Sequence, residues 1–234
     1  MVMYISISNF RKEYILLSFS SSVAKIFFSG GGDEIQSFAF DSAFASHLQL
    51  PKNVLYIPVA MKNKNISYDD CLSWITKTLD AHGIKKITMC TDLSSMTITE
   101  IKKYAAIYIG GGNTFVLMKQ IRESGFDKRL WQYAQDPDKV IYGGSAGAII
   151  LGSSIRLTKY LDEQEESVYL QGLGFYQRLI FPHYSQEHHR KKLIEESSDD
   201  AIVALSEESG IVVAENIVHP IGDDVYFFDA DSSQ

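Results

Sequence analysis

Short apolar runs alternate with longer amphipathic stretches along the chain. Strand-like runs occupy 24–28, 54–59, 86–90, 105–109, 140–142, 179–181 and 201–205. Most of them are apolar almost throughout, which is typical of buried strands. Apolar residues recur at helical spacing over 33–48, where Asp33 is placed as the N-cap, and also over 68–82 and 113–123. Because strands alternate with helices, the pattern predicts an α/β fold: a mostly parallel sheet with helices on both faces, a three-layer sandwich.

Glycine-rich turns follow three of the predicted strands. They lie at 29–32, 110–113 and 143–147. In open parallel sheets, binding and catalytic sites form at the carboxyl ends of the strands. The sequence therefore predicts a site at one edge of the sheet, built on backbone that other chemical groups can approach closely.

Composition and charge exclude several classes of protein. The 234 residues are 45% hydrophobic and 22% charged, as in an ordinary globular protein. Lys and Arg number 22 against 29 Asp and Glu, and no basic cluster offsets this, so no nucleic-acid partner is expected. The two cysteines, Cys71 and Cys90, are too few for a disulfide framework or a Cys-based zinc site. We therefore expect a cytoplasmic protein without a metal.

The N-terminus differs from the rest of the chain. Residues 11–24 combine a charged start, an apolar stretch and small residues, which resembles a weak secretory signal. A strand begins at once at Ala24, so we expect 1–23 to be an extension or an extra edge strand outside the catalytic core. No linker or repeat divides 24–234, which we interpret as one domain. No apolar run approaches the about 20 residues that a membrane-spanning helix needs, so no membrane partner is expected.

The turn at 143–147 fits the pattern G-x-S-x-G between a strand and a helix. A strained strand-to-helix turn lifts a serine hydroxyl clear of the backbone, and small neighbours let substrate and base approach it. The sequence therefore predicts Ser145 as a nucleophile. The turn at 110–113 lacks the Lys-Ser/Thr pair of a phosphate loop. We interpret the N–H groups of Gly112 and Ala146 as an oxyanion hole.

A serine nucleophile needs a base, and the sequence contains six histidines. Most of them lie near helix ends or on a charged helical face, as His188 and His189 do. His183 is different, because it follows the apolar strand 179–181 and Pro182 and so lies at a strand end. The sequence therefore predicts His183 as the general base.

Three motifs together resemble a known family. They are Gly110-Gly111-Gly112-Asn113-Thr114-Phe115, Gly144-Ser145-Ala146-Gly147-Ala148 and Pro182-His183-Tyr184, with Phe27-Phe28-Ser29-Gly30-Gly31-Gly32 at the start. In this order they resemble the aspartyl dipeptidase (dipeptidase E) serine peptidases, relatives of cyanophycinase, over about residues 24–228. The resemblance implies a fold related to class I glutamine amidotransferases, and a Ser-His-acid triad without metal or cofactor. It also implies small peptide substrates with N-terminal Asp.

The resemblance leaves two candidates for the acid. One is Asp162, or Glu163 beside it, in the acidic run 161–166, which is also typical of a solvated loop. The other is Glu207, which follows the apolar strand 201–205 at its carboxyl end, and we favour it. Asn113 is predicted to contact the substrate. Arg190 either binds the substrate aspartate or belongs to a solvated basic helix face.

Two other functions are weighed against a peptidase. An α/β-hydrolase esterase would need a histidine late in the chain, and only His219 qualifies. An amidotransferase-like binding module without catalysis would be expected to lack a triad residue, yet each has a candidate. We therefore predict a serine peptidase acting on small peptides, as a monomer or homodimer.

Overall fold

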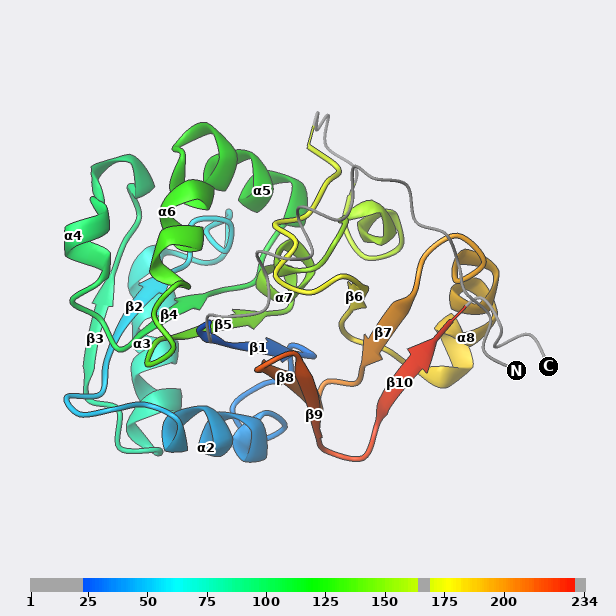
Figure 1. Ribbon diagram of the computed structural model, residues 1–234, viewed down its shortest axis with the longest axis horizontal. Helices are drawn as coiled ribbons and strands as arrows, with labels where there is room; N and C mark the ends of the chain where they lie inside the picture. The colour runs from blue at the N-terminus through cyan, green and yellow to red at the C-terminus, as the bar shows by residue number, and fades with distance from the viewer. Residues whose placement is uncertain (1–22, 164–168, 230–234) are drawn as a thin grey trace, which may run out of the picture.

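The computed structural model describes residues 23–163 and 169–229, and within them a seven-stranded sheet forms the centre of the fold (Figure 1). Its strands, in spatial order, are β3 (Lys86–Met89), β2 (Asn53–Ile57), β4 (Ala106–Ile109), β5 (Val140–Gly144), β1 (Lys25–Ser29), β8 (Gly210–Ala214) and β9 (Ile217–Ile221). The first five are parallel to one another, β8 runs antiparallel to β1, and β9 runs antiparallel to β8. The predicted mostly parallel sheet is confirmed.

Helices cover both faces of this sheet (Figure 1). One face packs against α2 (Phe38–Ser46) and α3 (Tyr68–Asp80), and the other against α5 (Thr114–Glu123), α6 (Phe126–Tyr133) and α7 (Ala146–Leu151), with α4 (Ile98–Ile101) beside α6. Successive strand residues point to opposite faces. In β2, for example, Tyr56 faces α2 and α3, whereas Leu55 faces α5 and α6. The central strands β1, β2, β4 and β5 are buried on both sides, as their continuous apolar runs predict, whereas the edge strands β3 and β9 are partly exposed.

The first helix begins later than predicted. Asp33 does not cap it, because the N-cap position is occupied by Ser37. Asp33 Oδ1 accepts hydrogen bonds from the backbone N–H groups of Ile35 (2.9 Å) and Gln36 (3.0 Å), before the helix begins. These bonds form a turn in place of the first helical residues, a local alternative that Asp side chains favour. The helix starts at Phe38, and the turn places Gln36 near the carboxyl ends of the strands.

A smaller sheet lies beside the main one (Figure 1). It consists of β6 (Leu179–Phe181), β7 (Ile202–Leu205) and β10 (Val225–Phe228). One of its faces packs against α8 (Gln186–Glu196) and the 3-10 helix η2 (Arg156–Tyr160), and the other adds Ile180, Val203 and Leu205 to the main core. The sequence predicted β6 and β7 as strands, but their apolar pattern did not distinguish a second sheet from the first. The residues that follow β6 and β7 thus reach the turn after β1, where Gly30 O accepts the N–H of His183 and the Gly32 N–H donates to Glu207 O.

Most of the predicted N-terminal extension, residues 1–22, lies outside the described part of the chain. Its separation from a single domain over 24–234 therefore stays a prediction. Among the residues that the structure describes, no helix combines the length and the apolar character needed to cross a membrane.

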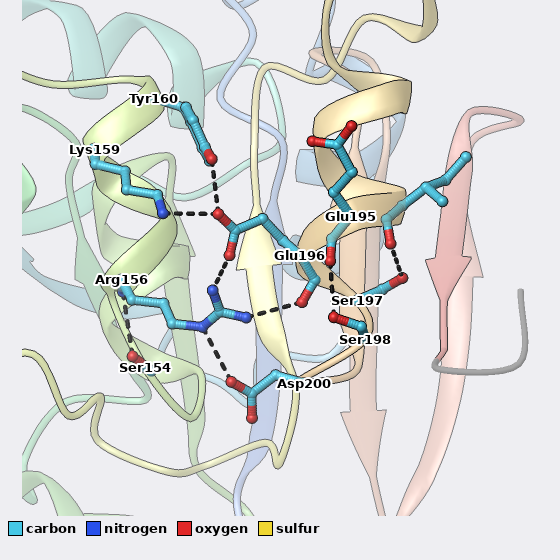
Figure 2. A network of polar contacts seen from close by, with 10 residues as sticks. Ser154, Arg156, Lys159, Tyr160, Glu195, Glu196, Ser197, Ser198 and Asp200 are labelled. Carbon is cyan, nitrogen blue, oxygen red and sulfur yellow. Dashed lines mark hydrogen bonds and ion pairs between the residues drawn. The ribbon is translucent and has the colours of Figure 1, made fainter. Parts of the chain in front are cut away.

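A network of charged side chains joins η2 to the end of α8 (Figure 2). The Glu196 carboxylate contacts the Arg156 guanidinium and accepts from Lys159 Nζ and the Tyr160 hydroxyl, both at 2.7 Å. Arg156 Nε also donates to Asp200 Oδ2 at 3.0 Å. Burial by itself would raise the pKa of Glu196, but the bonds from Lys159, Tyr160 and Arg156 outweigh it and lower the pKa to about 2. The network therefore stabilises the junction between the two segments only while Glu196 is ionised.

We expect the stability of the protein to depend on pH through Glu196. The pKa of the folded state lies below the reference value of 4.5, so the stabilisation is complete above that pH and is lost as pH falls through about 2. One pKa unit corresponds to about 1.4 kcal/mol, and solvent screens part of it. Glu196→Gln should therefore lower the free energy of unfolding by about 2 kcal/mol at pH 7.

Urea unfolding of both proteins at pH 7 and at low pH measures this effect, and the difference should shrink at low pH. Glu195→Gln on the same helix is the matched control, because its carboxylate makes no ion pair with any described residue. An equal loss of stability in the two variants would show that the network contributes nothing specific.

Candidate active site

Ser145 lies on the sharp turn between β5 and α7. Its φ is 51°, in the left-handed region that non-glycine residues rarely adopt. The turn depends on glycine at both sides. A Cβ at Gly143 would lie 2.5 Å from Gly147 O, and one at Gly147 would lie 2.3 Å from Ile109 O. The G-x-S-x-G pattern therefore reflects close backbone packing that holds Ser145 at the end of the strand.

His183 lies next to Ser145, at the end of β6. The hydroxyl oxygen of Ser145 and Nε2 of His183 are 2.8 Å apart. His183 also has a positive φ, 52°, and its N–H donates to Gly30 O at 3.0 Å. A Cβ at Gly31 would lie 2.6 Å from the imidazole Cε1 and 2.9 Å from Ser145 Cβ. The glycine-rich turn after β1 thus leaves the space in which the two side chains meet.

Glu207 lies on the other side of the imidazole. Its Oε1 is 3.2 Å from His183 Nδ1, and its Oε2 accepts from Gln36 Nε2 at 2.8 Å. The Gly32 N–H donates to the Glu207 carbonyl at 3.2 Å, which ties this turn to the turn after β1. Serine, histidine and glutamate thus form a continuous chain of polar contacts. Sequence analysis missed Gln36, since nothing in a surface turn before a helix indicated it.

Asp162, the alternative acid, lies elsewhere. Its Oδ2 accepts from the Thr114 N–H at 2.8 Å, at the first residue of α5. Asn113 is the N-cap of the same helix: its Oδ1 accepts from the Val116 N–H at 3.1 Å and its Nδ2 donates to Glu163 O at 3.2 Å. Both side chains satisfy the free N–H groups of a helix start. Of the two predicted carboxylates, the structure brings Glu207 to His183 and not Asp162.

The two backbone groups predicted for the oxyanion hole are available. Among the described residues, neither the Gly112 N–H nor the Ala146 N–H has a hydrogen-bond partner. Gly112 has φ of 104°, and a Cβ there would lie 2.0 Å from Ala60 O, so this position requires glycine. A Cβ at neighbouring Gly111 would lie 3.3 Å from Ser145 Cβ, which places this turn directly against the serine.

A pocket of about 190 Å³ opens beside Ser145 and His183. Glycines of the three turns form much of its lining, and the larger side chains in it are Met61, Trp74, Tyr108 and Tyr142. No lysine or arginine is among its lining residues in the described part of the chain. Neither Asn113 nor Asp162 is among them.

Two other predicted residues lie away from this pocket. Arg190 is exposed on α8 and is not among the residues that line it. His219, required by the esterase alternative, is exposed in β9 and lies opposite Val212 of β8. Of these two histidines, the structure brings His183 to Ser145 and not His219.

In serine hydrolases, a serine on a strained turn is hydrogen-bonded to a histidine, and that histidine contacts a carboxylate. Comparison with known protein families identifies the family within this class. The chain belongs to peptidase family S51, whose sequence profile matches residues 26–223. The protein is a serine peptidase, which confirms the family that the motifs resembled.

Relatives and solved structures agree with this assignment. The chain is 27% identical to an uncharacterized peptidase of Pasteurella multocida over 147 residues, 61% of this chain and 69% of that one. It is 28% identical over 147 residues to one of Listeria monocytogenes, 61% of this chain and 70% of that one.

Two crystal structures share the fold. A candidate peptidase E from Listeria monocytogenes has a TM-score of 0.68 at 23% identity, covering 86% of this chain and 100% of that one. A peptidase from an acI-B1 Actinobacterium has a TM-score of 0.70 at 17% identity, covering 90% and 92%. At these identities the structures show the fold alone.

Proposed function

We propose that the protein hydrolyses small peptides through an acyl-enzyme on Ser145, with His183 as general base and Glu207 as the acid of the triad. The observation that carries this proposal is the continuous chain of contacts, 2.8 Å from Ser145 Oγ to His183 Nε2 and 3.2 Å from Nδ1 to Glu207 Oε1. The family supports the class of reaction, and the two contacts support the roles proposed for the three side chains.

The proposed reaction has two halves. The hydroxyl of Ser145 attacks the peptide carbonyl while His183 Nε2 takes its proton, and the oxyanion accepts hydrogen bonds from the N–H groups of Gly112 and Ala146. When the C–N bond breaks, His183 returns the proton to the leaving amine. Water then attacks the acyl-enzyme by the same route and frees Ser145. Glu207 holds the imidazole with its Nδ1 proton toward the carboxylate and stabilises the imidazolium.

The size of the pocket supports small substrates. At about 190 Å³, the pocket has room for one substrate side chain beside Ser145 and His183. The further prediction from the resemblance, an N-terminal aspartate, would call for a cation near Ser145. Arg190, proposed for that purpose, lies outside the pocket lining. The aspartate preference stays a prediction, as do the cytoplasmic location and the monomeric or homodimeric state.

Labelling by a fluorophosphonate probe tests the proposed chemistry. The probe reacts with a serine only when a base and an oxyanion hole activate it. We expect wild-type protein to be labelled at Ser145 and His183→Ala to be labelled at least about 100-fold more slowly. A non-catalytic binding module would not react. His219→Ala is the matched control, and slow labelling of that variant would instead support the esterase alternative.

A further inference from the structure

The Glu207 side chain is only partly covered by protein, and a second side chain holds its carboxylate. Its exposed fraction is 47%. Among the described residues, Oε1 of Glu207 contacts His183 Nδ1 at 3.2 Å, and Oε2 accepts from Gln36 Nε2 at 2.8 Å. A glutamate side chain loses considerable rotational freedom when it is held in one conformation. At a half-exposed position, the orientation of the carboxylate toward the imidazole therefore depends on the contact with Gln36.

The amide group of Gln36 is itself fixed in one orientation. Its Oε1 accepts from the backbone N–H of Asp33 at 3.1 Å, while Asp33 Oδ1 accepts from the backbone N–H of Gln36 at 3.0 Å. An amide oxygen only accepts hydrogen bonds and an amide NH2 group only donates them. A flipped amide would set its oxygen against the carboxylate and its NH2 group against the Asp33 N–H. The hydrogen-bond network therefore assigns the NH2 group to Glu207.

The turn that carries Gln36 lies directly against the turn that carries Glu207. The Asp33 carbonyl accepts from both the hydroxyl and the N–H of buried Ser37, at 2.8 and 2.9 Å, which closes the turn before α2. A Cβ at Gly32 would lie 2.3 Å from Glu207 O and 2.7 Å from Gln36 Cβ. The absence of a side chain at Gly32 thus lets the two side chains meet.

We propose that Gln36 is a positioning residue of the active site. Its amide holds the Glu207 carboxylate toward His183, and so keeps the imidazole aligned with the serine hydroxyl. Gln36 is not among the residues that line the pocket, so it acts through Glu207 and not on the substrate. An uncharged donor suits this role, because it orients the carboxylate without neutralising the charge that stabilises the imidazolium. The inference rests on the proposed function, since it concerns the same triad.

Gln36→Met tests the proposal, because methionine has a similar length but no amide. We expect kcat for dipeptide hydrolysis to fall by about tenfold, while KM stays within about twofold because the pocket lining is unchanged. The loss is smaller than on removal of the Glu207 charge, since the carboxylate is still present but less often oriented. Gln49→Met is the matched control: Gln49 Nε2 also donates to a carboxylate, Asp138 Oδ1 at 2.8 Å, but outside the pocket lining. It should leave kcat within about twofold of wild type.

Gln36→Glu separates the proposed role from a purely local one in the turn. Glutamate keeps an oxygen that can accept from the Asp33 N–H, but it replaces the donor that faces Glu207 with a second carboxylate. The two like charges repel each other. We expect kcat at neutral pH to fall by at least about tenfold, with little change in the melting temperature.

A double-mutant cycle shows whether Gln36 acts through Glu207. In a Glu207→Ala background, Gln36→Met should change kcat by less than about twofold, because no carboxylate is left to orient. An equal loss in both backgrounds, or full activity of Gln36→Met and Gln36→Glu with Glu207 intact, would overturn the inference. Hydrolysis by the wild-type protein and its labelling at Ser145 would in that case leave the proposed function standing. A wild-type protein that showed neither would remove the proposed function itself.

Discussion

Replacing Ser145 by alanine should lower kcat for peptide hydrolysis by at least about 10⁴-fold, because no other group can form the acyl-enzyme. The substitution removes one hydroxyl and keeps the Cβ. The strained φ of 51° is therefore equally unfavourable before and after the change. The hydroxyl contacts His183 and faces the pocket, so little packing is lost. The measurement is steady-state kinetics on small dipeptides, with thermal unfolding of the same preparations.

The matched control for Ser145→Ala is Ser153→Ala, a serine that follows α7 and lies outside the pocket lining. It should keep kcat within about twofold of wild type. Residual activity of Ser145→Ala within about tenfold of wild type, with an unchanged melting temperature, would contradict a serine nucleophile. A large fall in melting temperature would instead mean that the turn at Ser145 needs the hydroxyl for folding.

The second large effect is expected at Glu207. Glu207→Gln keeps the shape of the side chain but removes the charge that stabilises the imidazolium, and its amide can turn an N–H toward His183 Nδ1. We expect a loss of about 100-fold or more in kcat/KM. The loss should be smaller than at a fully buried triad acid, because 47% of the Glu207 side chain is exposed and water screens its charge.

Asp162→Asn separates the two candidate acids. The asparagine oxygen can still accept the Thr114 N–H, so the start of α5 is kept and kcat/KM should stay within about threefold of wild type. Kinetics of the two variants on one dipeptide decide the question. If Asp162→Asn lost more activity than Glu207→Gln, then Asp162 would have to move to His183 in the working enzyme, and Glu207 would be structural.

Local sequence was sufficient for the framework of this protein. Apolar runs with β-strand lengths, separated by amphipathic stretches, predicted the parallel strands and the helices on both faces. The glycine-rich turns predicted the edge of the sheet that holds the site, where Ser145 Oγ and His183 Nε2 lie 2.8 Å apart. These features could be predicted because burial and turn geometry act on residues that are neighbours in the chain.

Other features depended on how distant segments pair. The antiparallel strands β8 and β9, and the separate sheet of β6, β7 and β10, have apolar patterns that do not specify their partners. Asp33 was predicted to cap the first helix, but its side chain forms a turn before α2. This turn places Gln36 where its amide contacts Glu207.

The tertiary structure also decided which of the candidate side chains reach the site. Glu207 follows a predicted strand, Asp162 lies in an acidic run and Arg190 in a helix-like basic stretch, and the sequence left the roles of all three open. Only the packed fold directs Asp162 to the start of α5, Glu207 to His183 and Arg190 to the exposed face of α8. The direction of a side chain beyond a turn is set by the segments packed against it, which come from parts of the chain far away in sequence.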